Sequence, residues 1–136
     1  MTDQQKYTQK LKGAHILIIG GSAGIGFGVA EAALEHGARV TISSSQDSRI
    51  KDAVSRLQRA YPSASSKIDG HVCNLADENT LESDVEALFN KVGTVDHIVY
   101  TAGDKLATVP LEEATLAKMK QAGMVNGFSP RSPRLV

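Results

Sequence analysis

Short apolar runs alternate with stretches of helical periodicity along most of the chain. The run at residues 16–19 is apolar at every position, as a central parallel strand covered by helices on both faces must be. Further strands are predicted at residues 39–43, 68–73 and 95–100. Strands that alternate with helices indicate an α/β fold in which crossover helices join the strands of a parallel sheet.

Three helices are predicted between these strands. The first runs from Ile25 to Gly37, a residue suited to the left-handed conformation at a helix C-terminus. The second is ended by Pro62 and the serine-rich stretch after it. Asp77 is a candidate N-cap for the third, which Gly93 ends. The apolar positions expected to be buried are Ile50, Val54, Leu57 and Ala60 on the second helix, and Leu81, Val85, Leu88, Phe89 and Val92 on the third.

The last part of the chain has a different character. Pro110 fits the first turn of a fourth helix that runs to about Ala122. Beyond Val125 the periodicity stops and prolines, serines and arginines follow, so residues 126–136 are predicted to be a disordered, divergent tail. The ordered part is then a single domain within residues 1–125.

Composition and charge exclude several classes of function. The 136 residues are 41% hydrophobic, too apolar for a disordered chain, and 15 basic side chains balance 15 acidic ones. We therefore expect no nucleic acid or anionic membrane as partner. One cysteine excludes a disulfide framework, and the four histidines have no metal-ligand spacing. No apolar run approaches the roughly 20 residues that span a bilayer and the N-terminus is polar, so we expect a cytoplasmic protein.

The segment from Gly20 to Gly26, GGSAGIG, lies where the first strand gives way to a helix. Glycines let the backbone approach a ligand closely, and the free N–H groups and the helix dipole at this position favour an anion. A merely tight turn between strand and helix is the alternative. Because the loop follows the first strand of an alternating α/β pattern, nucleotide binding is the favoured interpretation.

The glycine spacing G-x-x-x-G-x-G resembles that of the short-chain dehydrogenase/reductase family. Residues 37–44 resemble the family's second strand, residues 73–77 its adenine-contacting turn, and residues 95–103 its fourth strand and N-N-A-G motif. The chain departs from the family pattern at Ile19, at Asn74 where aspartate is common, and at Tyr100-Thr101 in place of two asparagines. The resemblance implies the N-terminal part of a Rossmann-like, doubly wound parallel sheet, with strand order 3-2-1-4.

The resemblance also implies a nicotinamide dinucleotide cofactor and the residues that hold it. Asn74 retains an amide oxygen that accepts a hydrogen bond from adenine, and Thr101 retains a hydroxyl beside the ribose. The implied cofactor-binding residues are Gly20, Ser22, Gly24, Ile25, Gly26, Ser44, Ser45, Asn74, Thr101, Ala102 and Gly103.

The end of the second strand favours NADP(H) over NAD(H). A carboxylate there would bind the ribose hydroxyls of NAD and repel the 2′-phosphate of NADP, but this chain has Ser44 followed by Ser45. The arginine that many NADP-dependent members carry is missing at Ser45. Arg49 and Lys51 are two candidate sources of positive charge, the alternative being that both form a solvated face.

The catalytic tyrosine, lysine and serine of the family have no counterpart in this sequence. In the family a lysine four residues after the tyrosine lowers the tyrosine pKa, since an unassisted tyrosine with a pKa near 10 suits neutral pH poorly. None of Tyr7, Tyr61 and Tyr100 is followed by such a lysine. Asn126 lies near the spacing of the family's catalytic asparagine, although coincidence is the competing explanation.

These observations predict a truncated form that carries only the cofactor-binding half of an NADP(H)-dependent oxidoreductase of carbonyls or alcohols. The alternatives are a non-catalytic nucleotide-binding, dimerising or regulatory fragment, and an unrelated Rossmann-like binder. Full-length members are expected to be homo-oligomers. In this chain strand four, with Ile98, Val99 and Tyr100, would be an open apolar edge, so we expect weak stability and either aggregation or pairing through that strand.

Overall fold

The computed structural model describes residues 10–103, 111–113 and 115–117. Its strands β1 (His15–Ile19), β2 (Arg39–Ser44), β3 (Ile68–Val72) and β4 (His97–Tyr100) form one parallel sheet in the order β3-β2-β1-β4. The predicted fold class and strand order are confirmed. The predicted strand boundaries differ from the observed ones by one residue at three strand ends and by two at the start of β4.

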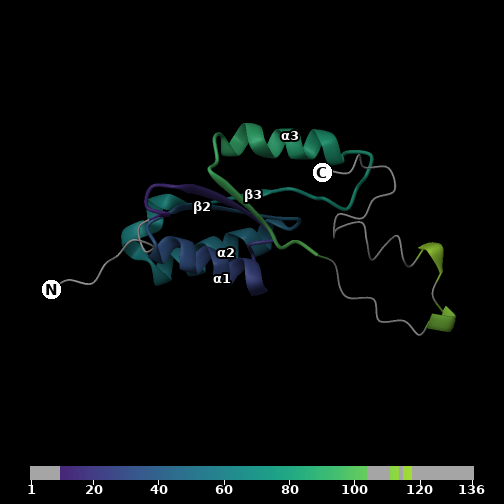
Figure 1. The fold of residues 1–136 in the computed structure, drawn as a ribbon, viewed down its shortest axis with the longest axis horizontal. Helices are drawn as coiled ribbons and strands as arrows, with labels where there is room; N and C mark the ends of the chain where they lie inside the picture. Colours follow the sequence, from purple (N-terminus) through teal and green to yellow (C-terminus); the bar gives the residue numbers. More distant parts are fainter. Residues whose placement is uncertain (1–9, 104–110, 114, 118–136) are drawn as a thin grey trace.

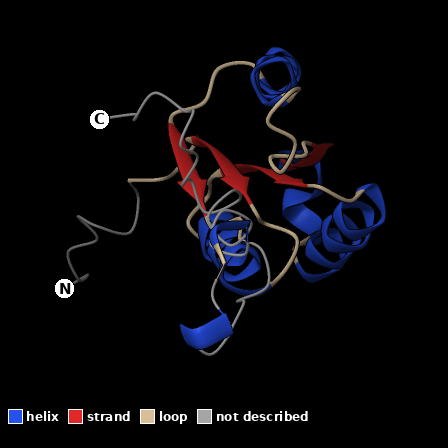
Figure 2. Ribbon diagram, turned by 90° about the vertical axis from the view of Figure 1, so that its right-hand side faces the viewer, coloured by secondary structure: helices blue, strands red, loops and turns tan. Residues whose placement is uncertain are grey.

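Helices cover both faces of this sheet. Helices α1 (Gly24–Glu35) and α2 (Asp47–Ala60) lie on one face and, among the helices that the structure describes, α3 (Leu81–Val92) covers the other (Figures 1 and 2). A 3₁₀ helix, η1 (Pro62–Lys67), connects α2 to β3. Because all four strands are parallel, their carboxyl ends lie at one edge of the sheet.

Alternate residues of β1 face the two helical layers. Ile16 and Ile18 pack with α1 and α2, whereas Leu17 packs with Leu88 and Val92 of α3. Leu17 and Ile18 have no exposed surface. The prediction that this strand is apolar on both faces is therefore confirmed, and burial of each such side chain contributes about 1.5–3 kcal/mol to folding.

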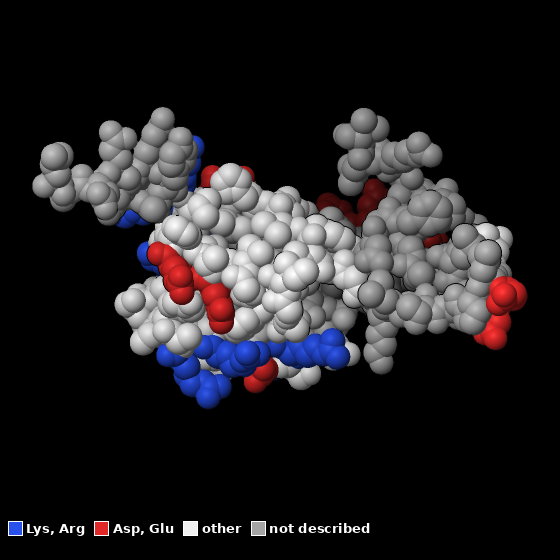
Figure 3. Space-filling model, turned by 60° about the horizontal axis from the view of Figure 1, so that its bottom comes forward, with Lys and Arg blue, Asp and Glu red and all other residues white. Residues whose placement is uncertain are grey.

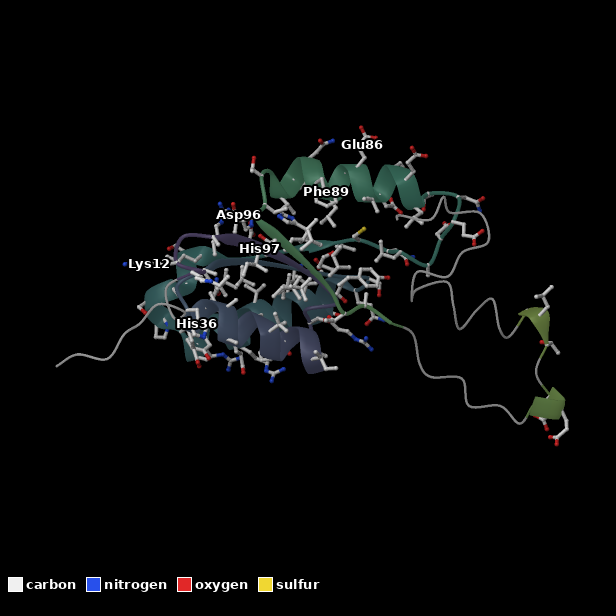
Figure 4. The ribbon with its side chains drawn as sticks, viewed as in Figure 1. Lys12, His36, Glu86, Phe89, Asp96 and His97 are labelled. Atoms are coloured by element: carbon white, nitrogen blue, oxygen red, sulfur yellow. The ribbon has the colours of Figure 1, made fainter. Side chains whose placement is uncertain are left out.

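Two details of the predicted helices are wrong. Helix α3 begins at Leu81 behind the N-cap residue Thr80, because Asp77 is used in a turn of its own: its Oδ1 accepts a hydrogen bond from the N–H of Asn79 at 3.0 Å. On α2 the buried stripe consists of Ile50, Ala53 and Leu57, and Ala60 is exposed at the end of the helix. On α3, Phe89 points toward the sheet and Glu86 away from it, as the predicted periodicity requires (Figure 4).

The helix predicted from Pro110 is only partly present where the structure describes it. Residues Leu111–Glu113 form a short 3₁₀ helix, η2, and Thr115 is not helical, whereas Leu116 and Ala117 are helical. Leu116 is 69% exposed and so buries little apolar surface, and a short helix without packing is marginal in water. Pro110, the end of the predicted helix near Ala122, Asn126 and the predicted tail at 126–136 lie outside the described residues.

The buried side chain and the backbone of His15 form hydrogen bonds to two other segments at the amino end of the sheet. The Nδ1–H of His15 donates to the carbonyl oxygen of Thr94 at 2.8 Å, so Nε2 is the nitrogen that accepts from the Thr41 hydroxyl at 2.7 Å. The backbone N–H of His15 donates to the Asp96 carboxylate at 2.7 Å. These hydrogen bonds connect β1 to β2 and to the segment that leads into β4.

Strand β4 lies at the edge of the described sheet. Its side chains Ile98 and Tyr100 share a face with Leu17 and Ile19, but α3 does not cover them, and they are 52% and 47% exposed. The expected apolar edge is thus present in the described residues. None of the helices in the described residues has the length and apolar character needed to cross a bilayer.

Candidate functional site

A cleft of about 620 Å³ opens at the carboxyl edge of the sheet. Segments that follow each of the four strands contribute to it, and it lies where the strand order reverses direction between β1 and β4. In open α/β sheets this reversal point is where ligands bind. The lining residues are Ile19, Gly20, Ser22, Ala23, Ser44, Ser45, Gln46, Arg49, Cys73, Asn74, Leu75, Ala76, Thr101, Ala102 and Gly103.

The glycine loop packs directly against the end of β4. Gly20 has a φ of +93°, and a Cβ at this position would overlap the backbone nitrogen of Ala102. A Cβ on the buried Gly26 would overlap the carbonyl oxygen of Gly20 and the hydroxyl oxygen of Thr101. Glycine is required at both positions because the loop, the start of α1 and the end of β4 leave no room for a side chain.

Thr101 fastens this loop to β4. Its backbone N–H donates to the carbonyl oxygen of Ile19 at 2.8 Å. Its hydroxyl lies 3.2 Å from the carbonyl oxygens of both Ile19 and Gly20. Because a hydroxyl has one proton to donate, the Thr101 side chain is engaged with the loop while its residue also lines the cleft. This positioning role was not part of the sequence prediction.

Eight of the residues predicted to bind a cofactor lie together in the cleft, and three do not. The glycines at 24 and 26 and Ile25 belong to the first turn of α1 outside the lining, with Gly26 buried beneath the loop and Ile25 80% exposed. The lining residues that the prediction left out include Cys73, Leu75 and Ala76. Their position at the end of a predicted strand or just after it was the signal that would have identified them.

The side chain of Asn74 already serves its own loop. Its Oδ1 accepts a hydrogen bond from the backbone N–H of Ala76 at 3.0 Å, which shapes the turn after β3. An amide oxygen has a second lone pair, so Asn74 keeps the capacity to accept one more bond from a ligand in the cleft.

The cleft contains one charged side chain among its lining residues. That residue is Arg49, from the start of α2, and no aspartate or glutamate is among the described lining residues. Ser44, Ser45 and Gln46, with hydroxyl and amide groups, also line the cleft. The described lining is therefore suited to an anionic ligand.

Neither described tyrosine has the lowered pKa of a general acid or base. The Tyr61 hydroxyl donates to Glu35 at 2.7 Å, and this hydrogen bond raises the pKa of Tyr61 to about 12. Burial raises the pKa of Tyr100. Both shifts move the group further from neutral pH, where proton transfer is most effective. Within the described residues, no group of three His, Cys, Asp or Glu side chains is arranged to hold a metal ion.

Comparison with known proteins places this geometry in context. The model of the SDR-like Rossmann domain matches residues 7–132. The chain is 50% identical over 134 residues to the short-chain dehydrogenase/reductase fsr5 of Gibberella fujikuroi, covering 96% of this chain and 51% of fsr5. It is 36% identical over 125 residues to the short-chain dehydrogenase/reductase ATR9 of Stachybotrys chlorohalonatus, covering 88% of this chain and 48% of ATR9.

The fold is similar to that of a solved relative. The structure of the MalC reductase/Diels-Alderase from Malbranchea aurantiaca superposes with a TM-score of 0.76 at 31% identity, covering 87% of this chain and 47% of MalC. The chain spans about half the length of the curated relatives it matches. The matched half holds the parallel sheet β3-β2-β1-β4 and the cleft at its carboxyl edge.

Proposed function

The chain belongs to the short-chain dehydrogenase/reductase family, and we propose that it carries the NADP(H)-binding half of an oxidoreductase that acts on a carbonyl or an alcohol. The observation that carries this proposal is the cleft at the reversal point of the sheet, with a glycine loop in which side chains are excluded at Gly20 and Gly26. Such a loop allows a pyrophosphate to approach the backbone N–H groups.

Hydride transfer is the reaction class that the relatives named dehydrogenase/reductase support. A bound nicotinamide would supply the hydride donor or acceptor. The residues of this chain would hold it: Gly20 and Ser22 at the phosphates, Asn74 at the adenine, and the segment from Thr101 to Gly103 along the ribose. Neither described tyrosine has a pKa lowered toward neutral, and the chain spans about half the length of its curated relatives, so the proposal covers nucleotide binding by this chain and not turnover.

The preference for NADP(H) is supported by the end of β2. Ser44 and Ser45 offer hydroxyl donors there, and the part of the lining that the structure describes contains no carboxylate that would repel a 2′-phosphate. A carboxylate at this position would instead bind the two free ribose hydroxyls of NAD.

Calorimetric titration of the purified chain with NADPH and NADH tests this function. We expect both nucleotides to bind and NADPH to bind about tenfold more tightly, the effect of one contact of about 1.4 kcal/mol with the 2′-phosphate. Failure of both nucleotides to bind would refute the dinucleotide-binding function. Equal affinity, or tighter binding of NADH, would refute the cofactor preference alone.

A second candidate function is self-association through β4, as a non-catalytic dimerising or regulatory module. The observation that favours it is the half-exposed pair Ile98 and Tyr100 on a strand, His97–Tyr100, that contains no lysine or proline. Edge strands of soluble proteins are commonly protected by such residues, and an unprotected apolar edge is a template for pairing with another strand.

Light scattering coupled to size exclusion tests this association. We expect the apparent mass of the chain to rise with protein concentration and Ile98→Lys to suppress that rise, because a charge cannot be buried at a strand-to-strand contact without a partner. Leu116→Lys is the matched control, since Leu116 is equally apolar, is 69% exposed and lies outside the sheet. A concentration-independent monomer, or equal effects of both variants, would exclude pairing through β4.

Turnover of ketones with NADPH by this chain would favour the enzyme over the binding module.

A further inference from the structure

The structure distinguishes between the two basic residues that begin α2. Arg49 and Lys51 are two positions apart, and successive residues of an α-helix are separated by about 100° around its axis, so their side chains leave the helix in different directions. Arg49 lines the cleft and Lys51 does not.

Lys51 is engaged elsewhere on the helix. Its Nζ lies 2.7 Å from the Asp47 carboxylate, one turn earlier, and both side chains are largely exposed. The hydrogen bond to Asp47 also raises the pKa of Lys51. Lys51 is thus paired with a carboxylate of its own helix, and neither residue lines the cleft.

Arg49 makes no hydrogen bond or ion pair with another residue in the described part of the chain. Ser44, Ser45 and Gln46, at and just after the end of β2, line the same cleft and supply neutral hydrogen-bonding groups. A guanidinium presents several N–H donors in a planar fork, and this geometry matches a phosphate group in a way that a carboxamide or hydroxyl does not.

We propose that Arg49 is the residue that recognises the 2′-phosphate of NADP(H), together with the hydroxyls of Ser44 and Ser45. The proposal rests on the proposed nucleotide-binding function and adds to it a specificity-determining residue that reaches the end of β2 from α2. The 2′-phosphate is the group that distinguishes NADPH from NADH, so removal of the guanidinium weakens the binding of NADPH only.

The test compares two substitutions that change the net charge equally. Figure 3 shows that Lys and Arg side chains gather in a band on one face of the molecule. Helix α2 by itself contributes four basic residues: Arg49, Lys51, Arg56 and Arg59. The test therefore has to separate the general electrostatic field of these charges from a direct contact with the phosphate. Arg49→Gln and Lys51→Gln each remove one positive charge, and they do so two residues apart. Calorimetric titration with NADPH and with NADH gives four dissociation constants for the two variants, and thermal melting verifies that each variant is folded.

We expect Arg49→Gln to weaken NADPH binding about tenfold and NADH binding less than twofold, with Lys51→Gln changing neither by more than twofold. Arg49→Lys should recover part of the loss, since it restores the charge without the planar fork. Equal weakening by the Arg49 and Lys51 variants would overturn the proposal in favour of a general field. An unchanged ratio of NADPH to NADH affinity in Arg49→Gln would overturn it as well, while leaving dinucleotide binding by the unmodified chain established.

Discussion

Replacing Gly26 with alanine is expected to destabilise the fold by about 1–3 kcal/mol and to weaken NADPH binding by more than about tenfold. The added methyl group would overlap the carbonyl oxygen of Gly20 and the hydroxyl of Thr101, and both belong to the junction between the glycine loop and β4. The carbonyl is backbone and cannot rotate away, so the loop itself has to shift. Thermal melting and calorimetric titration measure the two effects.

Gly28 provides the matched control on the same helix. A Cβ there meets no atom within 4 Å, and the residue is exposed. Gly28→Ala should therefore raise stability by about 0.5–1 kcal/mol, as expected for alanine in a helix interior, and leave NADPH affinity unchanged. If Gly26→Ala has the same melting temperature and NADPH affinity as Gly28→Ala, the prediction is wrong, because the loop then does not depend on the absence of a side chain at position 26.

The second large effect is expected at His15. His15→Ala should lower the free energy of unfolding by about 2–4 kcal/mol, because it leaves the Thr41 hydroxyl and the Thr94 carbonyl without their partner and opens a cavity. Thr41 is 1% exposed, so water cannot readily replace the lost hydrogen bond. Urea denaturation followed by circular dichroism measures the loss.

His97 is the control for this substitution. It lies on the neighbouring strand β4 and is paired in register with Ile16, but its side chain is exposed. His97→Ala should change the free energy of unfolding by less than about 0.5 kcal/mol. A comparable loss in both variants would mean that histidine at the amino end of the sheet acts through strand propensity and not through the hydrogen-bond network.

The sheet could be predicted from the sequence because its signal is local. The apolar run at residues 16–19 marks a strand whatever its neighbours, and the glycine at position 37 adopts the expected left-handed conformation, with a φ of +83°. The start of α3 could not be predicted in the same way. Asp77 is as good a helix cap as it is a turn former, and its hydrogen bond to Asn79 shows that the turn prevails.

The sequence predicted which strand ends form the candidate site, but not which side-chain atoms are available there to bind a ligand. That Ser44, Asn74 and Thr101 meet at one edge follows from parallel strands alone. Which atoms remain available for a ligand depends on the hydrogen bonds that the side chains make within the fold: Thr101 bonds to the glycine loop, and the Asn74 oxygen bonds to its own turn. The choice between Arg49 and Lys51 depends on how α2 is rotated against the sheet, which no short stretch of sequence specifies.

The attachment of the glycine loop to β4 makes the cleft and the edge of the sheet one thermodynamic unit. The loop rests on Thr101 and Ala102, which directly follow that strand, so a nucleotide seated on the loop is stabilised only while β4 holds its place beside β1. By linkage, whatever orders β4 raises nucleotide affinity, and a bound nucleotide stabilises β4 by the same free energy. A change in the stability of β4 is therefore measurable as a change in nucleotide affinity, and the reverse holds as well.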